Sequence, residues 1–371
     1  MHDFDVAIVG AGIIGLAHAY VARQQGLRVV VFERNPQATG ASVRNFGLLW
    51  PIGQPAGERH SLAMRSREIW LEVLQSANLP YYPTGSLHVA RTAAEQQVLQ
   101  EFAEIGPDLG YPCEWLDAAS TLGKSAAVRP DGLAGALHSP TEITVDPRLT
   151  ITGLASLLAS TDVQFCFNTA VTAIEGSTVV TPGKKWHAER IFVCNGDDFS
   201  TLFPDLFAQS GITRCKLQML RTVPQPRDWK LGPALAGGLT LRFYQSFRIC
   251  PSLPTLAEQF ARQMPEYERW GIHVMASQGA DGSVTLGDSH EYGNAVDIFD
   301  KTRIDDLILQ YLQTFCVLPD LRIAQRWHGV YGKHPDLAYF RAKPEPGVHI
   351  VTGTGGAGMT LSFGIADESF S

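Results

Sequence analysis

The chain has 371 residues and a formal net charge of −7, from 30 Lys and Arg against 37 Asp and Glu, and 45% of its residues are hydrophobic. This composition is that of a well-cored globular protein, and the negative charge disfavours nucleic acid and anionic membrane surfaces as partners. The apolar stretch 6–22 is interrupted by Gly10, Gly12 and Gly15, so we expect no membrane insertion. No leader pattern precedes it, and the six cysteines are scattered without ligand spacing, which predicts reduced thiols, a cytoplasmic location and no metal site.

The predicted elements begin with a strand over 4–9, a helix that Gly26 ends, and a second strand over 28–32. This is the βαβ pattern of a parallel sheet. Further helices are expected at 61–77, 93–105, 147–158 and 303–315. Further strands are expected at 86–90, 163–167, 171–174, 178–180, 191–194, 215–221, 239–250, 273–277, 284–286 and 349–352. The ends therefore predict an α/β nucleotide-binding domain, and the middle predicts an inserted domain with an antiparallel sheet.

The first glycine loop, Val6-Ala-Ile-Val-Gly10-Ala-Gly12-Ile-Ile-Gly15, lies between the first strand and the first helix. Gly10 permits the tight turn, Gly12 lets the backbone approach a pyrophosphate, and Gly15 lets the helix pack on the strand. Backbone N–H groups at Ile13 and Ile14 would face the phosphates at the positive end of the helix. Glu33, followed by Arg34, closes the second strand at the distance expected for a ribose diol, which disfavours NADP. The loop alone leaves NAD and FAD open.

Two later segments carry a family resemblance. One is Ala38-Thr-Gly40-Ala-Ser42-Val-Arg44-Asn45-Phe-Gly47-Leu-Leu-Trp-Pro51, and the other is Val351-Thr-Gly353-Thr-Gly355-Gly356-Ala-Gly358-Met359-Thr360-Leu-Ser362. Between them come Val145-Asp146-Pro147, Val193-Cys-Asn195-Gly196, Lys216-Leu-Gln218 and Trp327-His-Gly329. In this order, over nearly the whole length, these segments resemble the D-amino-acid oxidase-like superfamily of FAD enzymes, which contains glycine oxidase and sarcosine oxidase.

The resemblance implies a Rossmann-like FAD-binding domain of the glutathione-reductase type, formed by 1–85, 141–212 and 325–371. An α+β substrate domain with an antiparallel sheet would comprise 86–140 and 213–324. A ring of backbone N–H groups and a helix dipole at the last glycine loop suits the N1–C2=O edge of a reduced flavin. Beyond the first loop, Glu33 and Arg34, the implied FAD contacts are Ser42, Arg44, Asn45, Gly47, Val171, Asn195, Gly196, Gly353, Gly355, Gly356, Gly358, Met359 and Thr360.

The resemblance also implies that hydride passes from a substrate carbon to flavin N5, leaving an imine that water hydrolyses. Tyr331 stands where carboxylate-recognising relatives commonly have Arg, which puts ordinary α-amino-acid recognition in doubt. No Cys stands in the region that tethers FAD in sarcosine oxidase-like enzymes, so non-covalent FAD is expected. Thr285 aligns approximately with the Lys that assists oxygen, so O2 or another electron acceptor stays open.

A substrate-binding face is expected on the strand predicted for 239–250. Over 241–250 the odd positions are mostly apolar, and alternation puts Arg242, Tyr244 and Arg248 on one polar face. This face either holds a carboxylate or phosphonate or lies in solvent. His273 and His290, in neighbouring β segments, either border the cavity or are structural.

The predicted function is therefore an FAD-dependent amine oxidase or dehydrogenase. It would oxidise the C–N bond of a small, anionic amine, such as an amino acid, an N-alkyl amine or an aminophosphonate. The catalytic candidates are Tyr244, Arg242, Arg248, His290 and Tyr331. Two alternatives remain: an FAD-dependent 2-hydroxy-acid dehydrogenase, and a non-catalytic dinucleotide-binding subunit of a larger complex.

Overall fold

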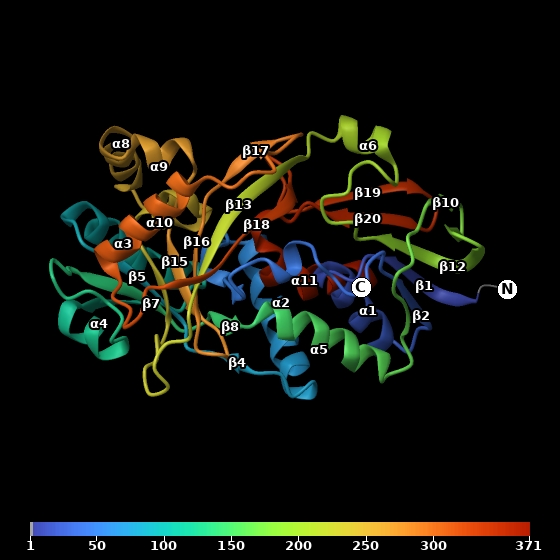
Figure 1. The fold of residues 1–371 in the computed structure, drawn as a ribbon, viewed down its shortest axis with the longest axis horizontal. Helices are drawn as coiled ribbons and strands as arrows, with labels where there is room; N and C mark the ends of the chain where they lie inside the picture. Colours follow the sequence, from blue (N-terminus) through green and yellow to red (C-terminus); the bar gives the residue numbers. More distant parts are fainter. Residues whose placement is uncertain (1–2) are drawn as a thin grey trace.

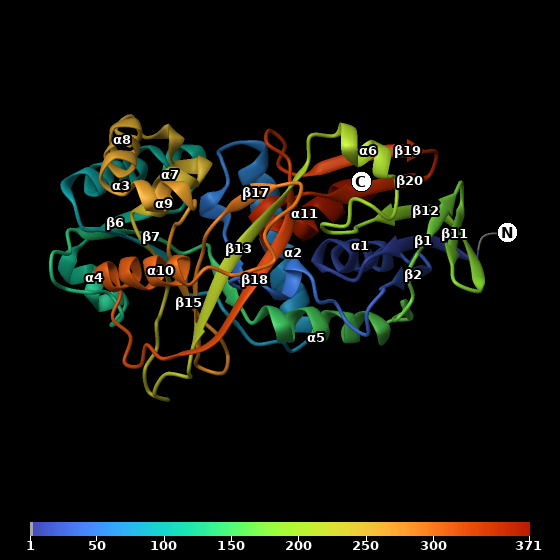
Figure 2. The same ribbon diagram turned by 45° about the horizontal axis from the view of Figure 1, so that its top comes forward.

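The computed structural model describes residues 3–371 and contains three β-sheets. Figures 1 and 2 show two halves side by side: strands β1, β2, β12, β19 and β20 on the right, and β5, β7, β15 and helices α3, α4 and α8–α10 on the left. Within the described residues, no helix has both the length and the apolar character that crossing a membrane requires.

The first sheet is the predicted parallel sheet with antiparallel additions. Strands β9, β2, β1, β12 and β20 pair in that order and are parallel. Antiparallel pairs add β11 and β10 beside β12, and β19 beside β20. The strands are β1 (Phe4–Val9), β2 (Val29–Phe32), β9 (Gln164–Cys166), β10 (Ala173–Glu175), β11 (Thr178–Thr181), β12 (Lys184–Val193), β19 (Phe340–Glu345) and β20 (Val348–Thr352).

Both faces of this sheet are covered, as a parallel sheet requires. On one face, Val6 and Ile8 join a buried cluster with side chains of the covering helices. On the other face, Ala7 and Phe32 pack in a second cluster with Trp186. The helices on the first face are α1 (Ile13–Gln24), α2 (Glu58–Ser76), α5 (Pro147–Ala159) and α11 (Gly358–Phe370), and α6 (Pro204–Gln209) lies on the second face.

The second sheet is built from the middle of the chain. All its pairs are antiparallel except β14 with β5. β18 begins at Ile323, beside the predicted domain boundary at 325, and pairs with β13 in this sheet. The strands are β5 (Ser86–Ala90), β6 (Glu114–Asp117), β7 (Gly135–Ser139), β13 (Thr213–Thr222), β14 (Ala234–Ala236), β15 (Met275–Gln278), β16 (Val284–Gly287), β17 (Glu291–Gly293) and β18 (Ile323–Lys333).

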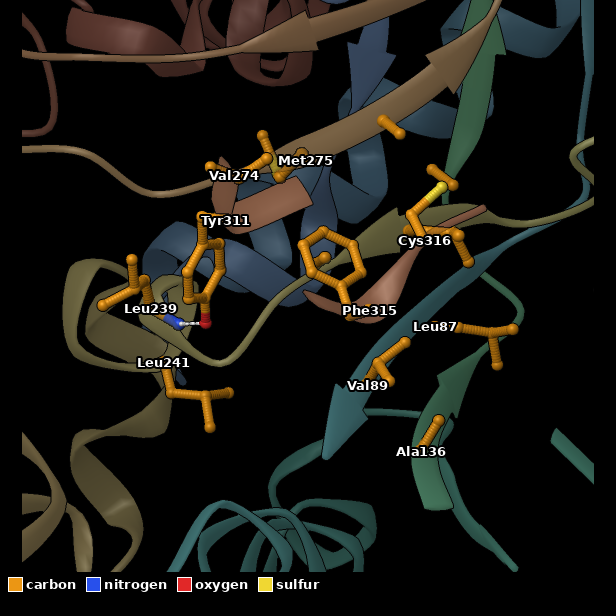
Figure 3. Close-up of a cluster of buried hydrophobic side chains, with 14 of the residues drawn as sticks. Leu87, Val89, Ala136, Leu239, Leu241, Val274, Met275, Tyr311, Phe315 and Cys316 are labelled. Atoms are coloured by element: carbon orange, nitrogen blue, oxygen red, sulfur yellow. Dashed lines mark hydrogen bonds between the residues drawn. The ribbon is translucent and has the colours of Figure 1, made fainter. Parts of the chain in front are cut away.

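Helices pack on the second sheet around the largest buried apolar cluster. Figure 3 shows Leu87 and Val89 on one side of this cluster and Tyr311 and Phe315 on the other. The Tyr311 hydroxyl accepts a hydrogen bond from the Leu239 N–H at 3.0 Å, which fixes the start of α7. The helices are α3 (Ala93–Ile105), α4 (Ala118–Lys124), α7 (Leu239–Phe243), α8 (Leu253–Gln263), α9 (Pro265–Arg269) and α10 (Thr302–Phe315), and a small third sheet holds β3 (Leu48–Leu49), β8 (Ile143–Val145) and β4 (Tyr81–Tyr82).

The strand predicted for 239–250 is wrong, because this segment forms α7 and the 3-10 helix η4 (Gln245–Ile249). Consecutive Ser246 and Phe247 are both buried, which a strand with alternating faces does not allow on a half-buried sheet. The segment packs against α10, where the Tyr311 hydroxyl accepts the Leu239 N–H and both Leu239 and Leu241 enter the apolar cluster. The apolar alternation that indicated a strand therefore belongs to two short helical turns.

Candidate active site

One large cavity, with a volume of about 850 Å³, is lined by residues of both sheets. The first glycine loop, the loop after β2, the segment after β12 and the last glycine loop all contribute to its wall. The predicted cofactor contacts that line it are Gly10, Gly12, Ile13, Ile14, Glu33, Arg34, Ser42, Arg44, Asn45, Val171, Asn195, Gly196, Gly353, Gly355, Gly356, Gly358, Met359 and Thr360. The sequence thus predicted a set of residues that converge on one space.

The first glycine loop lacks side chains at positions where a Cβ would clash with neighbouring backbone. Gly10 has φ +103°, and a Cβ there would lie 2.4 Å from the Cys194 carbonyl oxygen. Helix α1 begins after Gly12, which caps it without a side-chain hydrogen bond, and its first turn has no acidic residue. The positive end of the helix therefore points into the cavity with no acidic residue in its own first turn, and this end fits a pyrophosphate.

Polar side chains hold this loop in place. One oxygen of Glu33 accepts a hydrogen bond from the Ala11 N–H at 3.0 Å, and the other accepts one from the Asn35 N–H at 3.0 Å. The Ser42 hydroxyl accepts a hydrogen bond from the Ile13 N–H at 2.9 Å. Arg34 is paired with Asp198. The carboxylate of Glu33 is thus fixed at the cavity wall, beside the loop that would carry the phosphates.

The last glycine loop forms another part of the wall, beside the start of α1. It links β20 to α11, and Gly353 and Gly355 both adopt positive φ, at +66° and +57°. Helix α11 begins at Gly358 with no side-chain cap, so its first N–H groups are free of such a partner. Thr360 accepts a hydrogen bond from the Trp50 N–H at 2.9 Å, which ties α11 to the loop after β2. A flat ring with an anionic edge fits a wall of this kind.

Gly15 and Gly47, two predicted cofactor contacts, do not line the cavity. A Cβ at Gly15 would lie 2.0 Å from the Gly10 carbonyl oxygen, so this glycine serves the packing of helix on strand, as predicted for it. A Cβ at Gly47 would lie 1.9 Å from the Val145 carbonyl oxygen, which places Gly47 in a close backbone contact with β8. Both glycines therefore support the residues that line the cavity and do not line it themselves.

Aromatic side chains dominate the end of the cavity near the second sheet. The Tyr331 hydroxyl faces the last glycine loop, since a Cβ at Gly356 would lie 3.6 Å from it. The Tyr244 hydroxyl contacts the Met275 sulfur at 3.3 Å. Burial raises the pKa of both tyrosines well above the ordinary value, so both stay protonated at neutral pH. Both predicted tyrosines therefore reach the cavity as neutral hydrogen-bonding groups.

His273 and His290 reach the same end and enclose Asp288. His273 Nε2 lies 3.2 Å from one carboxyl oxygen of Asp288, and His290 Nε2 lies 3.9 Å from the other. The two imidazole rings stack at 5.1 Å, and Phe243 packs against both, at 3.9 and 4.4 Å. Burial raises the pKa of Asp288 well above its ordinary value, and it lowers the pKa of His290 to about 3.

Asp288 and Lys333 are residues that sequence reasoning missed. Lys333 lines the cavity, and its ammonium donates a hydrogen bond to the Tyr292 hydroxyl at 3.3 Å. Within residues 3–371, it makes no ion pair with a carboxylate. Alternation along β18 puts Lys333 on the same face as Tyr331, so the spacing of those two residues could have found it. Asp288 stands two residues before the predicted His290, a spacing that could have found it, and its other partner, His273, comes from another segment of the sheet.

Two predicted catalytic residues lie outside the cavity. Arg242 forms an ion pair with Glu268 at 2.6 Å, and neither it nor Arg248 contributes to the cavity wall. Arg248 is exposed on η4. The correction follows from the secondary structure, because the polar face that joined these arginines to Tyr244 needs a strand that does not form.

Residues 5–369 match the protein family described as FAD dependent oxidoreductase, or DAO. The chain belongs to this family. FAD is therefore its cofactor, and the convergence of both glycine loops on one cavity fits a molecule of that length. The predicted resemblance to the D-amino-acid oxidase-like superfamily is confirmed, as is the oxidoreductase class.

Relatives with described activities match parts of this FAD-dependent oxidoreductase. A glycine oxidase of Geobacillus kaustophilus is 26% identical over 207 residues, which cover 53% of this chain and 55% of the relative. An N-methyl-L-tryptophan oxidase of Citrobacter koseri is 24% identical over 212 residues, covering 55% of this chain and 56% of the relative. The chain thus spans about half the length of these two relatives.

Solved structures match the whole fold. The crystal structure of the Geobacillus kaustophilus glycine oxidase has a TM-score of 0.78 at 20% identity and covers 100% of this chain and 94% of its own. The FAD-bound L-α-glycerophosphate oxidase of Mycoplasma pneumoniae has a TM-score of 0.76 at 20% identity, with coverages of 100% and 94%. These likenesses confirm the predicted fold class.

Proposed function

We propose that this FAD-dependent oxidoreductase oxidises the C–N bond of a small amine that carries an anionic group. The candidate substrates are an amino acid, an N-alkyl amine or an aminophosphonate. The observation that carries the proposal is the position of Lys333 at the same end of the cavity as the buried His273–Asp288–His290 cluster, as a cation that pairs with no carboxylate among the described residues. A cation and a hydrogen-bonding cluster suit the two ends of such a molecule.

Lys333 takes the role that the sequence analysis gave to Arg242 and Arg248. Burial lowers the pKa of its ammonium, and the rings of Phe243 and Tyr292 lie 5.8 and 5.1 Å from its nitrogen. A half-buried ammonium among aromatic rings gains strongly from a carboxylate or phosphonate brought to it, because the cavity screens charges less than water does. Tyr331, two residues earlier on β18, offers its hydroxyl on the same side.

Bound FAD supplies an acceptor for the hydride that leaves the substrate carbon. The chain holds the cofactor and orients the amine, with Tyr244, Tyr331, His290 and Lys333 at the substrate end. The residues proposed to hold FAD are Gly10, Gly12, Ile13, Ile14, Glu33, Arg34, Ser42, Arg44, Asn45, Val171, Asn195, Gly196, Gly353, Gly355, Gly356, Gly358, Met359 and Thr360. FAD is proposed to bind without a covalent link, so acid precipitation of the protein releases all of it into the supernatant.

The relatives support amine oxidation. A glycine oxidase and an N-methyl-L-tryptophan oxidase both act, by name, on molecules with an amine and a carboxylate. An L-α-glycerophosphate oxidase shares the fold and acts, by name, on a phosphorylated alcohol, which keeps C–O oxidation of an anionic alcohol as the second candidate. Lys333 would serve either anion, so the two candidates differ in the atom that is oxidised.

Anaerobic reduction of the bound flavin separates these candidates. The purified protein is mixed with sarcosine, N-methyl-2-aminoethylphosphonate, N-methylbutylamine, lactate and glycerol 3-phosphate, and the flavin band near about 450 nm is followed. We expect the two anionic amines to bleach it and to release an alkylamine or ammonia after turnover. Bleaching by lactate or glycerol 3-phosphate alone would replace the proposal with the alcohol candidate.

A further inference from the structure

We propose that Asp288 accepts the proton that the substrate ammonium must lose before oxidation, and that His273 and His290 position its carboxyl group. The inference rests on the proposed amine substrate. It assigns a proton-accepting role to Asp288, which was not predicted, beside His290, which was a catalytic candidate, and His273, which was expected either to border the cavity or to be structural.

The three side chains are buried and incompletely satisfied. His273, Asp288 and His290 are 2%, 5% and 6% exposed, and all three line the cavity. His273 Nδ1 lacks a hydrogen-bond partner within residues 3–371, and His273 Nε2 and the Asp288 oxygen 3.2 Å from it are in contact without hydrogen-bond geometry. Unpartnered buried polar atoms destabilise a fold, so their presence on a cavity wall indicates a polar ligand that completes them.

A backbone contact fixes the tautomer of His290. Its Nδ1 lies 2.9 Å from the Gly271 carbonyl oxygen. A carbonyl can only accept, so Nδ1 carries the hydrogen of the neutral ring and Nε2 keeps its lone pair. That lone pair faces the second carboxyl oxygen of Asp288 at 3.9 Å. His290 therefore turns an acceptor toward the Asp288 carboxyl group, at a distance that becomes a hydrogen bond only when a protonated Asp288 moves closer.

The charges around Asp288 suit a carboxyl group that exchanges a proton with an amine. Burial raises the pKa of Asp288 toward that of an ammonium. The smaller pKa difference lowers the free energy needed to move a proton from the substrate ammonium to Asp288. The histidines stay neutral, because burial and the nearby cations lower the pKa of both. The other titratable or charged groups that act on this cluster are Arg242, Lys333, Tyr244, Tyr331, Tyr292 and Cys215.

The proton balance is simple. The amine arrives as R2NH2+ and meets the Asp288 carboxylate, the N–H bond breaks, and an O–H bond forms on Asp288. The nitrogen regains its lone pair, which is the form from which hydride can leave the neighbouring carbon. Lys333 meanwhile binds the anionic tail, and the total charge of enzyme and substrate is unchanged because the proton only moves from the nitrogen to Asp288.

The test compares Asp288→Asn with Asp281→Asn. Asp281 lies in the loop between β15 and β16, pairs with Arg148 at 3.5 Å, and is outside the cavity wall. The measurement is the second-order rate constant of anaerobic flavin reduction by N-methyl-2-aminoethylphosphonate at a series of pH values. This constant corresponds to kcat/KM for the amine. For the wild type and Asp281→Asn, we expect a value that rises until Asp288 is ionised and is then nearly constant up to the pKa of the amine.

For Asp288→Asn, we expect kcat/KM near pH 7.5 to fall at least about 100-fold, because a lost acid–base group costs that much. The remaining rate should climb about tenfold per pH unit toward the amine pKa, since only the free base then reacts. A merely structural role would lower the rate without creating this slope. The ratio of bound flavin to protein, measured in each variant, reports whether the variant folds.

Three outcomes overturn the inference. One is an Asp288→Asn variant with wild-type rate and pH profile, while amines still reduce the flavin, which leaves the proposed function standing. Another is a wild-type kcat/KM that itself rises about tenfold per pH unit up to the amine pKa, because only the free amine would then react. This outcome can be read even if the variant does not fold. The third is a stoichiometric metal ion in the wild type whose removal by EDTA abolishes amine oxidation. Failure of every amine to reduce the flavin would instead sink the proposed function.

Discussion

The first glycine loop and the cluster around Asp288 line the same cavity, but backbone forms one end and side chains form the other. At Gly10, the absence of a Cβ creates the site, since an added methyl group would lie 2.4 Å from a carbonyl oxygen. At the other end, His273, Asp288 and Lys333 come from the region before β15, the region after β16 and the end of β18. The cofactor end is thus a local property of the chain, whereas the substrate end depends on how distant strands pair.

The largest expected effect follows from placing a side chain in the backbone end. Gly10→Ala adds a Cβ against the Cys194 carbonyl at a φ of +103°. This strain costs at least about 2 kcal/mol, so we expect the purified variant to lose most of its bound FAD. The measurement is the ratio of flavin to protein absorbance. Gly123→Ala, in α4 with nothing within 4 Å of its Cβ, is the matched control and should keep the wild-type ratio. Full FAD content in Gly10→Ala would contradict the claim that bare backbone forms the cofactor end of the cavity.

This contrast also explains what could be predicted from sequence. The glycine loops were found because each is contiguous and each needs glycine for a local backbone reason. His273 and His290 were named as candidates for the cavity wall, but the contact of His273 with Asp288 could not be predicted, because it depends on the register that sets Met275 against Gly287. The strand predicted for 239–250 failed for a related reason, since contacts of Leu239 with α10 decide its conformation.

A second prediction concerns the substrate end. Lys333→Met removes the cavity's ammonium while keeping its aliphatic length, so KM for anionic amines should rise at least about tenfold with kcat nearly unchanged. Kinetics with N-methylbutylamine should not change, because it carries no anion. Lys343→Met, an exposed lysine on β19, is the control. An equal effect on neutral and anionic amines would show that Lys333 supports structure rather than charge recognition.

A third prediction concerns acid stability. His88, buried against Trp50 and Phe247, has a pKa lowered to about 3 by burial, so the folded state resists a proton that the unfolded state accepts below about pH 6.5. Stability is therefore lost as pH falls from 6.5 toward 3, by about 2 kcal/mol between pH 7 and 5. Between pH 7 and pH 5, the free energy of unfolding measured with urea should fall by about 2 kcal/mol less in His88→Leu than in the wild type. His187→Leu, at an exposed position, should keep the wild-type dependence.

The smallest expected effect tests the corrected arginine assignment. Arg248 is exposed and outside the cavity wall, so Arg248→Met should change KM for anionic amines by less than about twofold. Steady-state kinetics with sarcosine and N-methyl-2-aminoethylphosphonate measure this directly. A tenfold rise in KM would return Arg248 to the substrate site and would remove the case for Lys333 as the anion-binding group.

The most direct test of the account is the anaerobic reduction of bound flavin by N-methyl amines that carry an anionic group and by one that does not. The account predicts that N-methyl-2-aminoethylphosphonate or sarcosine bleaches the band near about 450 nm at a concentration at least about tenfold lower than N-methylbutylamine does. Lys333→Met should abolish that difference. Bleaching by lactate or glycerol 3-phosphate with no response to any amine would contradict the account.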